Sequence, residues 1–509
     1  MTIVLPHGVL FRGGEEGEIR KNLIENNHID AIIGLPANIF FGTGIPTIIM
    51  VLRQKRENTD VLIIDASKGF IKEGKNNKLR ASDIKRIADT FIKRESVAKF
   101  SRVVSREEIR SNDYNLNIPR YVDSSEAAEH WDVYASMFGG IPTAEIDEMS
   151  EFWTAFPALK KALFTESGIP YVNVSTPDIK SAIKSHPDVV GFENAFNAAF
   201  STFPAFLKEE LIDRMGSIEI SKAETVLSAD IFERLKEIPL IDKYAAFQLL
   251  DDDWTGISID LEMLQTEGFA ATKKVDPNLV IKKKDGKDQE VQEGWVGHII
   301  PFDLVQATLL SAETDELHGL ESRLAEIPSE YESILDEMTE EDKESCNDVL
   351  TEEGDAFVPK EVSKKIKELK KDRSPESVAL RTLLEKVESL VKSEKEIKAE
   401  IKAKSAALQA KTKDTIESLS DEQALDLLEK KWIAPLIESI HKLPDTVIDS
   451  LVSKIQALQN KYATTFFEVE QQISETEATL SGMIDDLEGN EYDMLGLNEL
   501  KKLLGGSAE

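Results

Sequence analysis

The feature that most constrains the fold is an alternation of strand-like and helix-like segments over residues 2–66. Short runs rich in isoleucine and valine are separated by glycine, proline and charged residues, and residues 47–52 are almost wholly apolar. Runs of this kind are typical of strands whose sheet is covered on both faces. The sequence therefore predicts an α/β region, with a helix at 15–27 and strands at 2–5, 31–35, 45–52 and 61–64.

A second helix and a further strand are expected before residue 123. Apolar residues recur at helical spacing over residues 83–94, and Ser82 is predicted to cap this helix. Residues 103–104 predict a short strand. The asparagine-rich segment 112–122 is expected to form a structured loop, because asparagine and proline favour turns.

After residue 123 the pattern changes to amphipathic helices. Residues 124–320 predict a mainly helical domain with a β-hairpin near 280–296, where Asp285-Gly286 is a favoured hairpin turn. Charged helices are expected over 321–435. In the last segment, 436–509, apolar residues recur at steps of three and four between Ile448 and Leu487, which predicts coiled-coil or assembly helices.

Charge is divided unevenly along the chain. Residues 1–123 hold 20 Lys and Arg against 16 Asp and Glu, whereas the remainder holds 41 against 78. This asymmetry favours a neutral-to-basic working domain joined to acidic helices that avoid DNA, although solvation of helical surfaces by Glu and Lys explains it equally well. With no apolar run near the roughly 20 residues of a membrane span, no secretory signal and a single cysteine, Cys346, a cytoplasmic protein without a membrane partner is expected.

Four stretches within residues 1–123 have a distinctive order and spacing. They are Val4-Leu-Pro-His-Gly-Val-Leu-Phe11 with Glu18-Ile-Arg20, Ile33-Gly-Leu-Pro-Ala-Asn-Ile-Phe40 with Thr43-Gly-Ile-Pro-Thr47, Ile63-Ile-Asp-Ala-Ser67, and Asn112-Asp-Tyr-Asn-Leu-Asn117 with Pro119-Arg-Tyr121. Together they resemble the modification (methylation) subunit of type I restriction–modification systems, an adenine-specific DNA methyltransferase. The resemblance implies S-adenosylmethionine as cofactor, no metal, and DNA, a specificity subunit and a restriction subunit as partners.

The resemblance also implies a fold class. Residues 1–123 would be the C-terminal half of the methyltransferase domain, a partial Rossmann-like sheet, followed by a mostly α-helical region that ends in a long coiled-coil arm. Long modification subunits of this family end in helices that dock on the specificity subunit. Two family features are absent from the 509 residues: the glycine-rich S-adenosylmethionine loop and the Asn/Asp-Pro-Pro-aromatic tetrapeptide. The chain has no Pro-Pro dipeptide, and Gly42-Thr43-Gly44 precedes a predicted strand instead of opening a helix.

The expected function is therefore that of a modification-subunit fragment, from a truncated or split gene. It would supply part of the methyltransferase fold and a helical arm for assembly with the specificity subunit. By itself it would be inactive, so its status as an enzyme stays open, and a separate N-terminal methyltransferase fragment is a candidate partner. The alternative is a non-enzymatic coiled-coil interaction protein derived from such a subunit.

Candidate site residues follow the predicted strand at 31–35, because open α/β sheets bind ligands at the carboxyl ends of their strands. A flipped adenine needs stacking and polar contacts, which predicts a target-base pocket at Asn38, Phe40, Phe41 and Thr43; the alternative is that Phe40 belongs to the core. Predicted contacts to the DNA backbone are Arg12, Arg20, Lys75, Lys78, Arg80 and Arg120.

No catalytic, cofactor-binding or metal-binding residue is predicted in this chain. His7 and His28 have no partner at a spacing that suits a hydrolase or a metal. The acidic run Asp251-Asp252-Asp253 lacks patterned oxygen ligands, which favours capping or solvated acids.

Overall fold

The computed structural model describes residues 1–40, 42, 44–125, 129–168, 170–284, 287–351, 355–372 and 374–504. Contacts divide the chain into two compact units, and neither is continuous in sequence. The first unit comprises residues 1–205, 221–255 and 436–509, and the second comprises 206–220 and 256–435.

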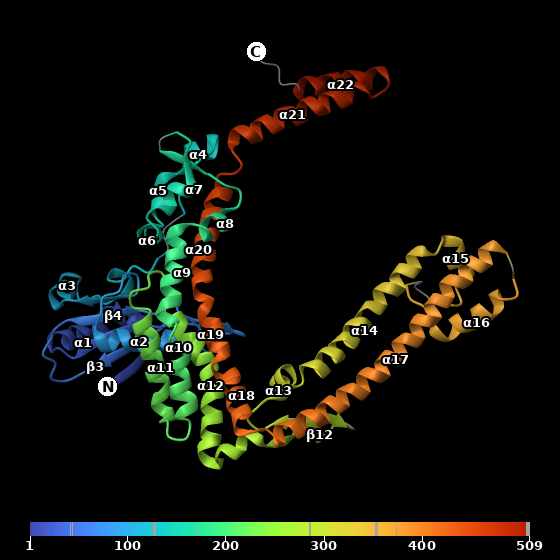
Figure 1. Ribbon diagram of the computed structural model, residues 1–509. Coiled ribbons are helices and arrows are strands. Elements are labelled where there is room, and N and C mark those ends of the chain that lie inside the picture. Colours follow the sequence, from blue (N-terminus) through green and yellow to red (C-terminus); the bar gives the residue numbers. More distant parts are fainter. Residues whose placement is uncertain are drawn as a thin grey trace. The chain divides into compact units, whose positions relative to one another are not determined.

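The N-terminal part of the first unit, blue in Figure 1, contains a five-stranded mixed sheet, and its strand order is β1-β3-β2-β4-β7. Strands β2 and β4 are parallel, and the pairs β1–β3, β2–β3 and β4–β7 are antiparallel, so β1, β2 and β4 run in the same direction. The predicted strands are confirmed, with small shifts at their ends: β1 (Thr2–Pro6), β2 (Ile29–Gly34), β3 (Thr47–Leu52), β4 (Val61–Asp65) and β7 (Ser101–Val104).

Both faces of this sheet are covered, as the apolar runs predict. Every residue of β2 and β4 is buried. Alternate residues of a strand point to opposite faces, and in β4 Ile63 joins one core whereas Leu62 and Ile64 join the other. The first core includes residues of α1 (Gly14–Glu25) and α3 (Arg106–Ser111), and the second includes residues of α2 (Ala81–Lys93). Each fully buried aliphatic side chain contributes about 1.5–3 kcal/mol to such a core.

Helix α2 begins earlier than predicted, and the prediction of Ser82 as its cap is wrong. Arg80 is the N-cap, and its backbone N–H donates to Asp83 Oδ2 at 3.0 Å. Ser82 lies buried in the first turn, where its N–H donates to Gln248 Oε1 at 3.0 Å. Because the helix already begins at Ala81, Ser82 lies inside it, and its backbone N–H is satisfied by a residue 166 positions away.

The asparagine-rich segment 112–122 is an ordered loop, as predicted, and it also covers the end of β2. Leu116 and Ile118 are buried, and Leu116 N–H donates to the Leu10 carbonyl at 2.9 Å. A side chain at Gly34 would bring its Cβ to 2.6 Å from Ile118 Cδ1. This close approach explains why glycine ends β2.

The rest of the first unit is mainly helical and includes a three-stranded sheet, β8-β10-β9, that the periodicity does not predict. Phe192, Phe196 and Phe200 of α9 are buried, so these aromatics form core. The remaining elements with all or most residues in this unit are η1 (His7–Leu10), β5 (Ile71–Glu73), β6 (Asn76–Lys78), η2 (Ile118–Arg120), α4 (Val133–Phe138), β8 (Ile141–Pro142), α5 (Thr143–Asp147), α6 (Ser150–Ala155), α7 (Leu159–Leu163), β9 (Phe164–Glu166), β10 (Tyr171–Val174), α8 (Ile179–Lys184), α9 (Pro187–Phe200), α10 (Phe203–Leu207), α11 (Ile220–Arg234), α19 (Ala434–His441), α20 (Leu443–Lys461), α21 (Phe466–Asp485) and α22 (Glu491–Leu504).

The predicted apolar seam from Ile448 to Leu487 is divided between two helices. Helix α20 ends at Lys461, and Thr465 caps α21 by accepting the Glu468 N–H at 3.1 Å. Seam residues of α20 are buried within the unit, whereas α21 and α22 pack against each other and leave apolar residues exposed. The exposed residues of these two helices include Phe466, Phe467, Ile473, Leu480, Met483, Tyr492 and Leu495.

The second unit contains the predicted hairpin and the long charged helices, of which α14 and α17 pack side by side (Figure 1). The turn residues Asp285 and Gly286 lie outside the described residues. Cys346 is fully buried, and burial raises the pKa of its thiol to about 11. The elements are η3 (Lys208–Asp213), η4 (Phe269–Lys273), β11 (Val275–Lys284), β12 (Lys287–Gly297), α13 (Phe302–Leu309), α14 (Ser311–Glu337), α15 (Glu340–Ser345), α16 (Pro359–Leu369), α17 (Pro375–Glu417) and α18 (Asp421–Trp432), and α12 (Lys243–Glu267) has residues in both units.

Among the described residues, no helix combines the length and the apolar content that crossing a membrane requires.

Candidate functional site

The carboxyl ends of β1, β2 and β4 meet at one edge of the five-stranded sheet, which we name the carboxyl edge. These three strands run in the same direction, so the residues that follow them lie along the same edge. His7 follows β1, Leu35 follows β2, and Asp65 is the last residue of β4. Ligands of open α/β sheets bind at such edges.

Asp65 is the central acidic group of the carboxyl edge. Its carboxylate accepts the Ser67 N–H at 3.0 Å and the Ser124 hydroxyl at 2.5 Å, so two donors fix its position. The Ala66 N–H donates to the Gly34 carbonyl at 2.9 Å and joins the ends of β2 and β4. Nearby, burial lowers the pKa of His7, and the charge of Asp65 opposes that shift.

The loop between β2 and β3 lies at this edge and holds the predicted target-base residues. Asn38 is exposed and has a φ of 54°, a left-handed conformation that asparagine tolerates better than most residues. Its carbonyl accepts the Asn77 N–H at 2.9 Å, which fastens the loop to β6. Phe40 is 41% exposed, which excludes the alternative that it belongs to the core. Phe41 and Thr43 lie outside the described residues.

The residues predicted to contact the DNA backbone fall into two groups. Arg120 and Lys75 are exposed, and Arg12, Lys78 and Arg80 are exposed beside single carboxylates. Arg20 differs from all of these because it is buried. Its guanidinium donates to the carbonyls of Tyr114 at 2.7 Å, Val9 at 2.8 Å and Arg12 at 3.0 Å.

Arg20 therefore joins three backbone segments of the fold. Burial lowers the pKa of its guanidinium, which remains the donor to those carbonyls. A side chain held in this way does not reach a phosphate, so the structure gives Arg20 a structural role where the sequence suggested an interface.

Sequence reasoning also missed a group of cations beside the end of β4. A cavity of about 420 Å³ lies there, and Lys68, Arg86 and Lys99 contribute to its lining. Lys68 directly follows the Ile63–Ser67 stretch, and this position is the one sequence feature that could have predicted a functional role for it.

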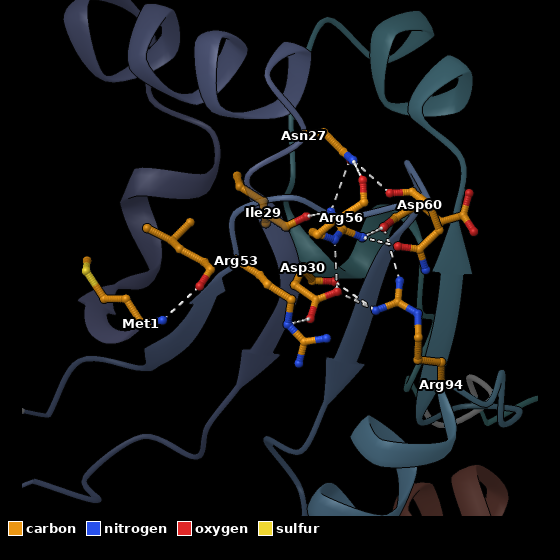
Figure 2. A network of polar contacts seen from close by, with 10 residues as sticks. Met1, Asn27, Ile29, Asp30, Arg53, Arg56, Asp60 and Arg94 are labelled. Atoms are coloured by element: carbon orange, nitrogen blue, oxygen red, sulfur yellow. Dashed lines mark hydrogen bonds and ion pairs between the residues drawn. The ribbon is translucent and has the colours of Figure 1, made fainter.

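The opposite edge of the same sheet carries charges that are paired. Asp30, at a bulge in the pairing of β2 with β3, is 2% exposed, and its carboxylate lies 2.6 Å from Arg94, 3.2 Å from Arg56 and 3.3 Å from Arg53 (Figure 2). Arg56 is itself buried and donates to the carbonyls of Ile29 and Asp60. We name these four charged residues the Asp30 network.

The acidic run Asp251–Asp253 lies inside α12, and burial followed by repulsion from Asp252 raises the pKa of both Asp251 and Asp253. Within the described ranges, no group of three or more His, Cys, Asp or Glu residues is arranged to hold a metal ion.

Comparison with known proteins relates the N-terminal quarter of the chain to DNA methylases. Residues 1–130 match the family described as N-6 DNA Methylase. The chain is 40% identical over 133 residues to the type I restriction enzyme MpnII methylase subunit of Mycoplasma pneumoniae. This aligned region covers 26% of this chain and 24% of that protein. The chain is 42% identical over 137 residues to the MjaVII methylase subunit of Methanocaldococcus jannaschii, with the same two coverages.

This chain also matches the solved structure of the type I restriction-modification system methyltransferase subunit from Streptococcus thermophilus. The sequence identity is 55%, the match covers 25% of this chain and 26% of the solved chain, and the TM-score is 0.24. The chain thus spans about a quarter of the length of the curated relatives that it matches. The resemblance seen in the sequence is confirmed for this N-terminal segment.

Proposed function

We propose that this chain works in type I restriction–modification as part of a modification (methylation) subunit. Residues 1–123 contribute the C-terminal half of an adenine-specific DNA methyltransferase domain. The observation that carries this proposal is the match of residues 1–130 to N-6 DNA methylases. The carboxyl edge of their sheet supports it, because it presents an exposed aromatic loop and a cavity lined by cations.

The family implies S-adenosylmethionine as the methyl donor, and its binding segment is proposed to lie outside α1. A cofactor loop is expected to contain glycines between a strand and a helix, and α1 has such glycines at its start. Gly13 is its N-cap, and Gly14 has a φ of 66°. Its first turn carries Glu15 and Glu16, and their charges oppose the carboxylate of the cofactor. The N-terminus of α1 would therefore not hold the methyl donor.

The role proposed for the chain's own residues is to receive the target adenine and to hold the DNA. Phe40, with Phe41, would stack against the flipped base, and Asn38 and Thr43 would contact its polar edge. Exposed Arg12, Lys75, Lys78, Arg80 and Arg120 would contact backbone phosphates and position the duplex without reading its sequence.

The helical remainder is proposed to serve assembly. Residues 124–320 would form a helical domain, 321–435 charged helices, and 436–509 an arm that docks on the specificity subunit, with a restriction subunit as a further partner. The exposed apolar residues of α21 and α22 support this role, because contiguous apolar surface on a soluble protein commonly marks an interaction site. A cytoplasmic location remains a prediction.

The experiment that tests the function measures methyl transfer to adenine in DNA. The 509-residue chain is assayed with a specificity subunit, with and without a separately expressed polypeptide that carries the glycine-rich loop and the Asn-Pro-Pro-aromatic tetrapeptide. We expect methylation in the mixture that contains this polypeptide and none without it.

Methylation without the added polypeptide, or tight S-adenosylmethionine binding by this chain alone in calorimetry, would show that the chain holds its own catalytic machinery. A complex that assembles fully and still fails to methylate would favour an assembly protein without a catalytic role. Deletion of residues 466–504 should abolish co-purification with the specificity subunit.

A further inference from the structure

The cavity beside β4 is built from segments that lie apart in the sequence. The loop that follows β4, the first two turns of α2, the turn before β7, and Ser124 with Ser125 enclose a space of about 420 Å³. A Cβ at Gly69 would lie 2.9 Å from Asp83 Oδ1, so the loop backbone packs directly on the first turn of α2. The walls are therefore held by tertiary packing.

The charges of the lining do not balance. Asp83 accepts two hydrogen bonds from the Arg80 guanidinium, at 3.0 and 3.1 Å, so these two charges offset each other. The remaining lining groups are the carboxylate of Asp65, which Ser67 and Ser124 engage, and three cations: Lys68, Arg86 and Lys99. Across the described part of the chain, neither Arg86 nor Lys99 forms an ion pair with a carboxylate.

One further carboxylate, that of Asp123, lies near Lys68 and Lys99. It accepts the Ser125 N–H at 3.0 Å, and this bonding to Ser125 is the main cause of its lowered pKa. Lys68, Arg86 and Lys99 still outnumber the carboxylates of Asp65 and Asp123, while Asp242 and Asp252 act on Arg80 together with Asp83. Such a surplus is the electrostatic condition for holding an anion.

The Arg86 guanidinium and the backbone of Lys99 are held in place before any ligand arrives. The Arg86 guanidinium lies 4.4 Å from the centre of the Phe100 ring and 5.8 Å from that of Tyr244, an arrangement that orients its planar donors. Lys99 has a φ of 59° in a turn closed by the Phe100 N–H bond to the Val97 carbonyl at 3.0 Å. A left-handed backbone is unfavourable for lysine, and such strain gathers at ligand sites.

We infer that this cavity is a phosphate subsite that holds the backbone of a nucleic-acid strand through Lys68, Arg86 and Lys99. Guanidinium donors match the geometry of phosphate oxygens, and the two lysines supply point charges, of which Lys68 also donates to the Ser124 carbonyl. The inference rests on the proposed function, since it takes DNA as the source of the phosphates.

Its position supports DNA as that source. Gly34 and Asp65 are partners in the register of β2 and β4, and neighbouring strands lie about 4.8 Å apart. The phosphate subsite therefore begins one strand away from the loop that holds Asn38 and Phe40. A single strand of nucleic acid can engage both places, with its backbone in the cavity and a base at the loop.

The test uses fluorescence anisotropy of a labelled duplex of about 20 base pairs, bound to the full chain in its complex with a specificity subunit. The test variant is the double substitution K68Q/K99Q, which changes two exposed side chains. The control, K55Q/K93Q, removes the same charge from exposed lysines near the opposite edge. Thermal unfolding of both variants should equal that of the wild type.

We expect K68Q/K99Q to weaken binding to the same extent for duplexes with and without the target sequence of the specificity subunit. The slope of log affinity against log salt should become less steep by about 2, because each phosphate that the protein no longer neutralises changes the slope by about 0.9. Arg86→Lys keeps the charge but removes the planar donors, so it should weaken binding less than Arg86→Gln.

An unchanged salt slope for K68Q/K99Q, with the wild type binding DNA, would overturn the subsite. Failure of the wild-type complex to bind DNA at all would instead overturn the proposed function. If inorganic phosphate binds to the wild type in calorimetry but not to K68Q/K99Q, while duplex binding is unaffected, the cavity is a small-anion site and not a backbone site.

Discussion

The two edges of the N-terminal sheet use the same residue types for opposite purposes. At the edge of the Asp30 network, three arginines surround a carboxylate that is 2% exposed, and the carbonyls of Ile29 and Asp60 take up further donors. At the carboxyl edge, Arg86 and Lys99 face a cavity without ion-pair partners among the described residues. The charged groups at the first edge hold the fold together, whereas those at the second edge are available to a ligand.

The difference follows from desolvation. A charge buried without a partner is strongly unfavourable, so a buried arginine persists only where carboxylates and carbonyls satisfy it. A charge in contact with water needs no partner and contributes little to stability, about 0–1 kcal/mol even when it is paired. The comparison therefore predicts that substitutions at the two edges change different measurements.

The largest effect is expected for Asp30→Ala. Removal of this carboxylate leaves Arg56 and Arg94 with uncompensated charge, and breaking a buried ion pair in this way lowers the free energy of unfolding by about 3–5 kcal/mol. Amide hydrogen exchange of peptides from β2 and β4 should accelerate strongly. Glu57→Ala removes an exposed carboxylate near the same edge and serves as the control. Equal exchange in the two variants would show that the network does not stabilise the sheet.

An intermediate effect is expected for Phe40→Ala at the carboxyl edge. This substitution should weaken binding of the flipped base without changing the stability of the fold. Stacking of a base on an aromatic side chain contributes about 1–3 kcal/mol, whereas an exposed phenylalanine adds little to folding. In the reconstituted complex, 2-aminopurine at the target position should lose the fluorescence change that reports flipping, and Phe40→Tyr should retain it. Ile71→Ala, at another exposed apolar residue of this region, should change neither flipping nor stability.

The smallest effect is a pH dependence at the carboxyl edge, which comes from His7. Burial lowers the pKa of His7 below its usual 6.5, so the folded state disfavours the protonated ring. His7 therefore favours the folded state most above pH 6.5, and the free energy of unfolding falls as the pH decreases toward the folded-state pKa of its ring. Nuclear magnetic resonance titration of the ring should give a midpoint below 6.5.

His7→Gln should remove this part of the pH dependence when urea unfolding is compared at pH 8 and pH 5.5. The Asp30 network should show no matching change from its arginines, because guanidinium groups stay protonated throughout that range. A midpoint above 6.5 would mean that the charge of Asp65 outweighs burial.

Local features of the N-terminal segment were predictable because periodicity and turn chemistry act over a few residues. The apolar runs at β2, β3 and β4 identified the strands, and their continuity predicted a sheet covered on both faces, which the two cores confirm. The cap of α2 was mispredicted, because the helix begins at Ala81, before the apolar periodicity starts, and the Arg80 N–H is taken up by Asp83. The seam from Ile448 to Leu487 has helical spacing throughout, yet Thr465 starts a new helix.

Local sequence patterns are sufficient to place the strands of the sheet and the helices that cover it, and the motifs of residues 1–123 indicate a family. Which charges are free depends on tertiary neighbours. Arg20 and Lys99 are equally basic in the sequence, but one is buried among three carbonyls and the other lines a cavity. Asp30 and Arg94 are 64 residues apart, and burial is set by such distant neighbours. The availability of a charge depends on the solvent and partners around it, and these exist only once the chain has folded.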